Sequence, residues 1–230
     1  MCDKAAKSIP SVESHLRAKI IEVPEAIYAC SGIKIKGKRI KSILFSTDVA
    51  IIRNHNADAV LAVYPFTPEL VIARTIIDIS TVPVFAGVGG GTTSGKRSID
   101  IAFNAELLGA YAAVVNSPTS PEDIAAMAEA IDIPIIATVG SSLDDYKRKV
   151  SAGAKIINVS AAAATPVLVR QIRAELGADF PIIATGGPTE ESIKQTVAAG
   201  ANAITYTPPT NAEIFADMMA RYRKGLKSGH

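Results

Sequence analysis

Residues 152–187 read AGAKIINVSAAAATPVLVRQIRAELGADFPIIATGG and hold one full period of a pattern that organises the chain. An apolar run at 155–161 follows a Gly-Ala step, a stretch of helical period follows at 165–177, and a proline-led apolar run follows at 181–187. Apolar runs without polar alternation are typical of strands covered on both faces of a parallel sheet. The stretch therefore predicts a strand, a helix and a second strand parallel to the first.

The same alternation extends over the chain from residue 41 onward. Apolar runs that we expect to be strands lie at 41–48, 59–65, 82–90, 110–118, 133–140, 155–161, 181–187 and 203–209. Connections of helical period, short in the first case, follow them at 49–56, 67–80, 97–109, 120–131, 142–153, 165–177, 188–200 and 211–227. Four βαβα units close a barrel of eight strands, whereas an open doubly wound sheet shows no such even repeat.

The first forty residues stand outside the repeat. We expect a helix over 11–21 and a hairpin over 32–41 that turns at Gly37, because apolar residues alternate with lysines there. The lysines indicate the solvated edge of a hairpin rather than a basic binding patch. The sequence thus predicts one structural domain, with an extension over 1–40 that covers the barrel bottom and an α/β (βα)8 TIM barrel over 41–230.

The composition argues against several classes of partner. The chain has 230 residues, of which 48% are hydrophobic and 20% charged, which is enough for one large core. A net charge of +2 without tryptophan does not favour nucleic acid or an anionic membrane surface. The apolar runs are too short to span a membrane and no signal peptide is recognised, so a cytoplasmic protein with reduced Cys2 and Cys30 is expected. The three scattered histidines predict no metal site, and a homo-oligomer is left open.

Functional residues of such barrels lie at the carboxyl ends of the strands. A polar side chain late in a strand is expected to point into the barrel mouth, because under a helix it would be buried without a partner. This rule selects Ser46, Asp48, Tyr64, Asn116, Thr138, Asn158, Ser160, Thr185, and either Thr205 with Thr207 or Tyr206. Asp48 is the one carboxylate of this set, so we expect it to be the general acid or base. Tyr64, Asn158 and Ser160 would orient the substrate.

A glycine-rich stretch over 87–98 lies between an expected strand and an expected helix. Glycines let backbone N–H groups approach an anion, and a helix N-terminus favours negative charge. The candidate anion ligands are therefore Gly89, Gly90, Gly91, Thr92, Thr93, Ser94, Gly95, Lys96 and Arg97. The alternative is an exposed loop with a solvated Lys-Arg pair. The stretch also approaches the P-loop pattern, but Arg97 stands where a Ser or Thr would bind magnesium, which argues against nucleotide binding.

A second glycine turn, Thr185-Gly186-Gly187, ends the run at 181–187. Here the sequence resembles the phosphate-binding branch of the aldolase-type TIM barrels, which includes keto-deoxy-phosphogluconate aldolases, sugar-phosphate epimerases and flavin-dependent barrels. The resemblance implies a phosphate held by this turn and by the turn after the next strand, where Thr207 stands in a stretch without the family's glycines. The chain is also similar to uncharacterised bacterial barrels that carry a hydrolase label.

The resemblance also implies a Schiff-base lysine. Keto-acid aldolases of this branch place a lysine on the strand that corresponds to residues 154–160, where this chain has Lys155. A lysine desolvated inside a barrel can lose its proton and attack a carbonyl carbon. Side-chain parity favours the other arrangement, in which Asn158 and Ser160 point into the mouth and Lys155 lies at the lower rim.

Together these features predict an enzyme that acts on a small anionic metabolite, phosphorylated or carboxylated. A lone carboxylate suits proton transfer next to a carbonyl group, so an aldolase-like lyase or an isomerase or epimerase is favoured over a hydrolase. A non-catalytic barrel that binds a phosphorylated effector and regulates a partner is a further alternative. No cofactor is predicted, and FMN and Mg²⁺ are alternatives without a supporting motif.

Overall fold

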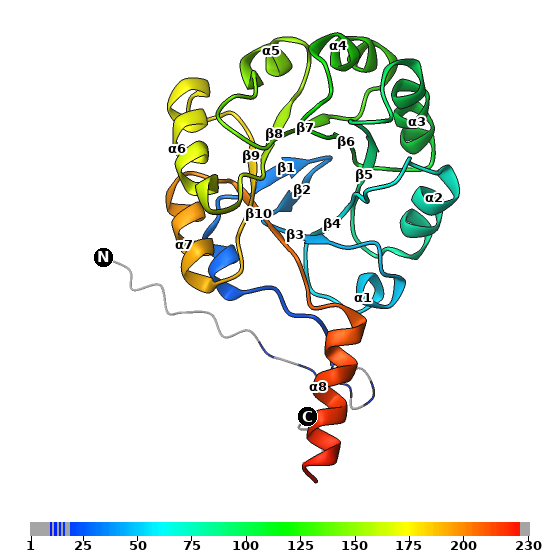
Figure 1. Cartoon of the computed structure of the whole chain (residues 1–230), viewed down its shortest axis with the longest axis vertical. Helices are drawn as coiled ribbons and strands as arrows, with labels where there is room; N and C mark the ends of the chain where they lie inside the picture. The colour runs from blue at the N-terminus through cyan, green and yellow to red at the C-terminus, as the bar shows by residue number, and fades with distance from the viewer. Residues whose placement is uncertain (1–9, 11, 13, 15, 17–18, 226–230) are drawn as a thin grey trace.

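A computed structural model describes residues 10, 12, 14, 16 and 19–225. Its centre is a closed barrel of eight parallel strands ringed by helices (Figure 1). Each strand pairs with its neighbours in the chain, and the last strand closes on the first, which confirms the predicted (βα)8 barrel. The barrel strands are β3 (Ser42–Phe45), β4 (Ala59–Ala62), β5 (Val84–Gly89), β6 (Ala112–Val115), β7 (Ile135–Val139), β8 (Ile156–Val159), β9 (Ile182–Thr185) and β10 (Ala203–Tyr206).

A helix follows each barrel strand, as the repeat predicts. Side-chain caps and early prolines start several of them; Ser120, for example, accepts a hydrogen bond from the N–H of Asp123 at the start of α4. No helix among the described residues is long and apolar enough to cross a membrane. The helices are α1 (Val49–Arg53), α2 (Leu70–Ile79), α3 (Gly95–Leu107), α4 (Pro121–Ala130), α5 (Tyr146–Ser151), α6 (Thr165–Leu176), α7 (Glu190–Ala198) and α8 (Asn211–Arg223), with 3-10 helices η1 (Glu25–Ala29) and η2 (Ala162–Ala164).

Two apolar clusters meet at the barrel wall. Outward side chains pack beneath the helices, together with helix residues such as Met127 and Ile172. Inward side chains fill the lower barrel, where Phe85 and Ile136 are fully buried. Burial of a side chain of this size contributes about 1.5–3 kcal/mol. The lower barrel is therefore a packed core rather than a pore, and it supports whatever binds above it.

The hairpin of β1 (Ile33–Ile35) and β2 (Lys38–Ile40) packs against the lower end of this core. Ile33, Ile35 and Ile40 belong to the same buried cluster as the inward side chains of the barrel strands. Alternation along the two short strands sends the isoleucines to the barrel and leaves the lysines exposed.

Residues 21–30 occupy the outer surface of the barrel between α1 and α7. Ile21 forms an isolated bridge with His55 just after α1, while η1 packs against α7 and buries Ile27 completely. The helix predicted over 11–21 is not found in those of its residues that the structure describes, and the others lie outside the described part of the chain. Residues 21–30 therefore cover a position where a barrel normally has an α-helix.

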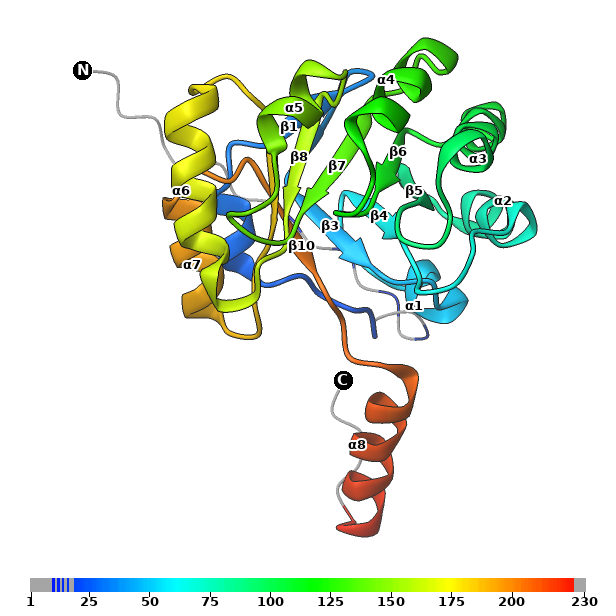
Figure 2. The same cartoon turned by 45° about the horizontal axis from the view of Figure 1, so that its top comes forward.

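The last helix does not pack against the barrel. The repeat predicts α8 as the final member of the outer ring, but the helix projects away from the body (Figure 2) and none of its residues is buried. Pro208 and Pro209 make the connection from β10 extended, and residues 21–30 already fill the space between α7 and α1. The prediction of a helix is confirmed, and the prediction of its packing is wrong.

Candidate functional site

A cavity of about 250 Å³, which we call the mouth cavity, opens at the carboxyl ends of the barrel strands. Its polar residues are those that side-chain parity selects for β6 to β10. On β10 the parity alternative resolves to Thr205 and Thr207, because Tyr206 packs against the outer cluster. The wall consists of Phe45, Leu61, Val63, Val114, Asn116, Thr138, Asn158, Ser160, Thr185, Thr205 and Thr207.

The mouth cavity has an apolar side and a polar side. Phe45, Leu61 and Val114 come from β3, β4 and β6, whereas β7 to β10 supply hydroxyl and amide groups. Every polar side chain in this wall is a neutral hydroxyl or amide, and no carboxylate, histidine or lysine belongs to it. A ligand that complements both sides combines a carbon portion with several hydrogen-bonding groups.

Two buried polar atoms in this wall have no hydrogen-bond partner. They are Oδ1 of Asn158 and Oγ1 of Thr205, in side chains that are only 6% and 5% exposed. Nδ2 of Asn158 donates a hydrogen bond to Oγ1 of Thr138 at 3.3 Å, so one end of the amide is held. A buried polar atom without a partner costs about 1–3 kcal/mol. Both side chains belong to the cavity wall, so we expect a polar ligand or an ordered water to supply the missing partners.

Ser46 and Asp48 do not line the mouth cavity, contrary to the prediction. The inward residues of β3 are Ile43 and Phe45, so Ser46 faces a neighbouring groove of about 220 Å³. Oδ1 of Asp48 accepts the N–H groups at the start of α1 at 2.8 and 3.1 Å, and Oδ2 accepts a hydrogen bond from Nδ2 of Asn211 at 2.6 Å. Asp48 is thus a helix cap that faces the groove beside the mouth.

A second cavity, of about 220 Å³, lies beside the mouth cavity and shares Val63 and Asn116 with it. Tyr64 lines this second cavity instead of the mouth, and its hydroxyl oxygen accepts a hydrogen bond from the N–H of Glu69 at 2.8 Å. The opposite wall is the glycine loop. That wall contains Gly87, Gly89, Gly90, Gly91, Thr92 and Thr93, and it includes neither Lys96 nor Arg97.

The glycines of this loop are required by packing within the chain. A β-carbon on Gly89 would lie 2.0 Å from Oγ of Ser98, and one on Gly90 would lie 2.5 Å from Cβ of Asn116. The φ angles of 151° and 115° also favour glycine at these two positions. The N–H of Gly90 donates to the carbonyl of Thr93 at 2.8 Å, so it is not free for a ligand. These glycines therefore let the loop backbone pack closely against Ser98 and Asn116 of the same chain.

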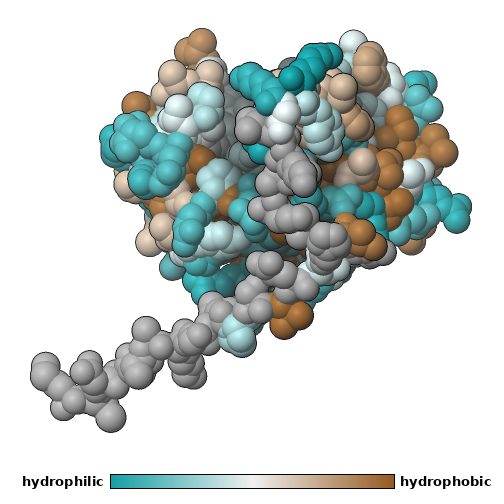
Figure 3. All heavy atoms as spheres, turned by 90° about the horizontal axis from the view of Figure 1, so that it is seen from below, coloured by the Kyte–Doolittle hydropathy of each residue, from teal (hydrophilic) through white to brown (hydrophobic). Residues whose placement is uncertain are grey.

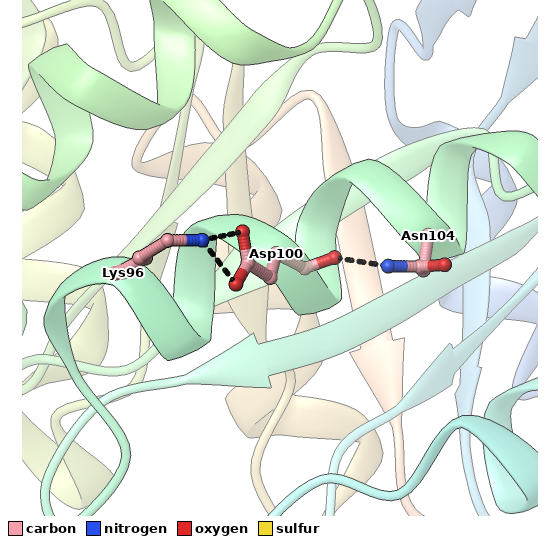
Figure 4. A network of polar contacts seen from close by, with 3 residues as sticks. All are labelled: Lys96, Asp100 and Asn104. Carbon is pink, nitrogen blue, oxygen red and sulfur yellow. Dashed lines mark hydrogen bonds and ion pairs between the residues drawn. The ribbon is translucent and has the colours of Figure 1, made fainter.

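The start of α3 is already neutralised by a carboxylate. The N–H of Gly95 donates to Oδ2 of Asp123 at 2.9 Å, where the prediction placed a bound anion. Lys96 pairs with Asp100 one turn along the same helix at 2.7 Å, and its side chain is 86% exposed (Figure 4). Arg97 is exposed as well, and Thr92 and Ser94 lie on the exposed part of the loop. The structure therefore supports the alternative of a solvated Lys-Arg pair.

The turn after β9 sends one predicted ligand into the mouth cavity, the side chain of Thr185. The N–H of Gly186 donates to the carbonyl of Thr205 at 3.2 Å, and Gly187 adopts a φ of 76° in the turn itself. The next helix, α7, has a Thr-Ser capping box and two glutamates in its first turn, which disfavour an anion there. Of the predicted phosphate ligands, Thr185 and Thr207 remain in the cavity wall.

The buried lysine of this barrel is not the predicted one. Lys155 precedes β8 at the lower end and is exposed, as the parity alternative predicts, so it is not placed for a Schiff base in the mouth. Lys149 of α5 is 4% exposed, and its Nζ donates to the carbonyl oxygens of Ser117 and Thr138 at 2.5 and 3.2 Å. Burial lowers the pKa of Lys149, against the opposing charge of Asp144.

Asp144 joins the two loops that form this side of the rim. Its Oδ1 accepts a hydrogen bond from Oγ of Ser117 at 2.7 Å, and Oδ2 accepts the N–H groups of Gly140 and Ser141 at 2.7 and 3.1 Å. Burial raises the pKa of Asp144, but these hydrogen bonds outweigh it, so the pKa is lowered overall. Asp144 and Lys149 thus hold the rim from behind the cavity wall, a role that our sequence analysis did not identify.

No family model matches the sequence, and no curated protein matches it. Solved structures match by fold. A phosphoenolpyruvate phosphomutase from Streptomyces platensis is 15% identical over 80% of this chain and 83% of its own, with a TM-score of 0.59. A 2,3-dimethylmalate lyase, described as a member of the PEP mutase/isocitrate lyase superfamily, is 14% identical over 89% and 87%, with a TM-score of 0.60. A phosphonopyruvate hydrolase in complex with oxalate and Mg²⁺ is 14% identical over 82% and 84%, with a TM-score of 0.59.

Magnesium in the hydrolase structure raises the question of whether this mouth fits the ion. Protein sites for Mg²⁺ use carboxylate oxygens in octahedral geometry. The described residues contain no group of three or more His, Cys, Asp or Glu side chains that suits a metal. The mouth wall offers neutral oxygens alone, so its residues do not fit this ion. At these identities the likeness establishes the TIM-barrel fold alone.

Proposed function

We propose that this barrel is a lyase or an isomerase that binds a small carboxylated or phosphorylated metabolite in the mouth cavity. The observation that carries the proposal is the pair of buried, unpaired polar atoms on Asn158 and Thr205 in one cavity wall. That wall lies at the carboxyl ends of the strands, where barrels of this fold have their active sites. Fold neighbours named for phosphonopyruvate and 2,3-dimethylmalate, both small carboxylates, are consistent with it.

Neutral donors hold the anionic group in this proposal. The hydroxyls of Ser160 and Thr207 donate to carboxylate or phosphate oxygens, and the hydroxyl of Thr185 joins them when it gives up its 3.5 Å hydrogen bond to the carbonyl of Val159. Charged acceptors make such hydrogen bonds shorter and stronger. Phe45 and Val63 on the other side cover the carbon portion of the ligand and exclude water. Exclusion of water lowers the local dielectric and strengthens each hydrogen bond to the anion.

Asp48 is the carboxylate available for proton transfer in this proposal. It lies in the groove that shares Phe45, Val63 and Thr207 with the mouth cavity. Its oxygens already accept three hydrogen bonds, from the N–H groups of Ala50 and Ile51 and from Nδ2 of Asn211. Catalysis therefore requires that the ligand reach the groove or displace the amide of Asn211.

A second function, a non-catalytic barrel that binds a metabolite and regulates a partner, is favoured by one observation. Every polar group in the described mouth wall is neutral, and general acid-base catalysis needs a titratable group within hydrogen-bond reach of the substrate. The two functions share the binding site and differ in turnover. Neither a nucleotide nor the P-loop pattern is part of either proposal.

Ligand-induced thermal stabilisation tests the binding site first. The probes are inorganic phosphate, sugar phosphates, and matched 2-oxo and 2-hydroxy acids, each with and without EDTA. A ligand at 100 times its dissociation constant adds about 2.7 kcal/mol, which raises the Tm by several degrees. Asn158→Leu should abolish the shift, whereas Lys96→Ala, with its exposed side chain, should keep it. Shifts that survive Asn158→Leu, or disappear with Lys96→Ala, would refute the mouth site.

Turnover of the ligand that binds then separates the two functions. One-dimensional NMR of the ligand with catalytic amounts of protein detects cleavage, isomerisation or exchange of a carbon-bound proton for deuterium. For an enzyme, Asp48→Asn should lower the rate by at least about tenfold with affinity retained, within the usual range for general acid-base groups. Binding without any conversion or exchange would leave the regulatory barrel as the function.

A further inference from the structure

The second cavity, between Tyr64 and the glycine loop, has no part in the proposed function so far. One of its sides is a run of ring-bearing residues, Tyr64, Pro65, Phe66 and Pro68, in the connection from β4 to α2. Phe66 is 76% exposed. Single exposed apolar residues are normal on a protein surface, and on the face seen in Figure 3 such residues are interspersed with hydrophilic ones. Phe66 differs, because it borders a cavity that three further rings also line.

The second cavity exists because two neighbouring barrel strands part at this point. β4 pairs with β5 as far as Ala62 and Ala86, and the chain then leaves the barrel wall toward α2. β5 continues beside β6 to Gly89, with an irregularity in the register after Gly87. The two diverging segments enclose the second cavity, whose other wall is the glycine loop.

The glycine loop makes its wall largely from peptide groups rather than side chains. Four glycines of the loop, at 87, 89, 90 and 91, contribute only backbone to this wall. Flat peptide groups on one side and rings on the other suit a planar group, since aromatic rings pack in offset-stacked or edge-to-face arrangements. An anionic group finds no cationic side chain there, because Lys96 and Arg97 lie outside the wall.

Asn116 joins the second cavity to the mouth cavity, because it lines both. Its backbone N–H donates to the carbonyl of Gly89 at 3.0 Å, whereas its side-chain amide has no hydrogen-bond partner among the described residues. The amide therefore offers donors and an acceptor to a ligand that passes between the cavities. Neither cavity alone, at about 250 and 220 Å³, reaches the roughly 300 Å³ at which ligand sites usually begin, and the two together do.

We propose that the second cavity binds an aromatic ring of the same ligand whose anionic group occupies the mouth cavity. This inference rests on the proposed function and narrows its substrate class to small carboxylates or phosphates that carry an aryl group. The anionic group meets the hydroxyls of the mouth, the linker passes Asn116, and the ring lies between Phe66 and the peptide groups of the glycine loop. The ring thereby covers Phe66, which is otherwise open to water.

Matched ligand pairs with and without a ring test this subsite on the full chain. The pairs are phenylpyruvate with pyruvate, 3-phenyllactate with lactate, and phenyl phosphate with inorganic phosphate, each titrated by isothermal calorimetry. In at least one pair the ring-bearing member should bind at least about tenfold more tightly, because burial of a phenyl group removes its apolar surface from water. Equal affinities within every pair would overturn the ring subsite and leave the proposed function standing. No binding of any member would overturn both.

Two phenylalanine variants locate the ring. Phe66→Ser should weaken binding of the ring-bearing member by about two- to tenfold, the usual contribution of an aromatic pair, and leave its ringless partner unchanged. Its Tm should stay that of wild type, because the side chain is exposed. Phe103→Ser on α3, 45% exposed and outside both cavity walls, is the matched control and should bind both members like wild type. A ring preference that survives Phe66→Ser, or that Phe103→Ser also removes, would place the ring elsewhere and contradict the proposal.

Discussion

Replacing Thr205 by valine should stabilise the unliganded protein and weaken ligand binding at the same time. The two side chains have nearly the same shape, so the change removes the hydroxyl and adds no volume. That hydroxyl is buried and unpaired in a side chain that is 5% exposed. An unpaired buried polar group costs about 1–3 kcal/mol. Since 1 kcal/mol corresponds to about 2–4 °C for a chain of this size, the Tm should rise by at least about 2 °C.

The matched control is Thr196→Val in α7. Thr196 is as buried as Thr205, at 1% exposed, but its Oγ1 donates to the carbonyl oxygen of Ser192 at 2.9 Å. Loss of that bond should lower stability by about 1 kcal/mol, so the two Thr→Val changes should have opposite signs. Urea unfolding at equilibrium measures both. The reasoning about the cavity is refuted if Thr205→Val destabilises the protein as much as Thr196→Val does.

Three further outcomes are expected. Asp123→Ala should destabilise the protein by about 0.5–2 kcal/mol in urea unfolding, because the N–H of Gly95 loses its acceptor; an unchanged midpoint would show that water replaces it. Burial lowers the pKa of Lys149 in the folded protein below its usual value of 10.5, so just below pH 10.5 the unfolded chain binds more protons and the free energy of unfolding should rise with pH. Lys149→Met should lose this rise in urea unfolding, and parallel stability profiles of the two proteins would refute the burial of this amine. Burial raises the pKa of Cys30 to about 11, so in a Cys2→Ser variant a thiol reagent at pH 8 should modify it only after unfolding, and rapid labelling of the native protein would contradict that burial.

The barrel could be predicted from the sequence because its determinants are local. A Gly-Ala step or a proline opens each of six strands, and each apolar run is followed by a stretch of helical period. Whether a helix packs on the barrel is not a local property. α8 and residues 21–30 compete for one surface, and the outcome depends on the burial of Ile27 and Val23 by the N-terminal segment. No window of sequence contains both competitors.

Side-chain parity correctly identifies residues of the mouth cavity when a polar side chain late in a strand has no other hydrogen-bond partner. Asn158 and Thr205 have no local partner, and both line the cavity. Asp48 and Tyr64 fail the rule for one reason, because each finds backbone N–H groups a few residues along the chain. A polar residue at the end of a strand is also at the start of the next helix, where a cap uses the same side-chain types. The parity rule is therefore reliable only after a helix-capping role for the residue has been excluded.

The glycine loop misleads for a related physical reason. A position that admits only glycine shows that some atom lies close to the backbone, and it does not show whose atom it is. At Gly89 the atom belongs to Ser98, and at Gly90 it belongs to Asn116. Lys149 is the opposite case, because a signal existed. It falls between Tyr146 and Val150 on the apolar face of a short helix, where a lysine is buried only if its charge is used.

Placement of the charged groups limits how this site can discriminate among ligands. Asp144, Lys149, Asp123 and Asp48 all support loops or helix starts, and the mouth wall is left with hydroxyls and amides. Such neutral groups are less costly to remove from water than charged groups are. They also contribute little long-range attraction, and binding should depend only weakly on salt. Selectivity must then come from the match of hydrogen-bond donors and acceptors between the site and the ligand. A site that binds a hydroxyl strongly rejects an analogue without that hydroxyl, because the polar groups of the site would be left unpaired. A 2-hydroxy acid and its 2-oxo counterpart should therefore differ in affinity far more than two acids that differ by one methylene.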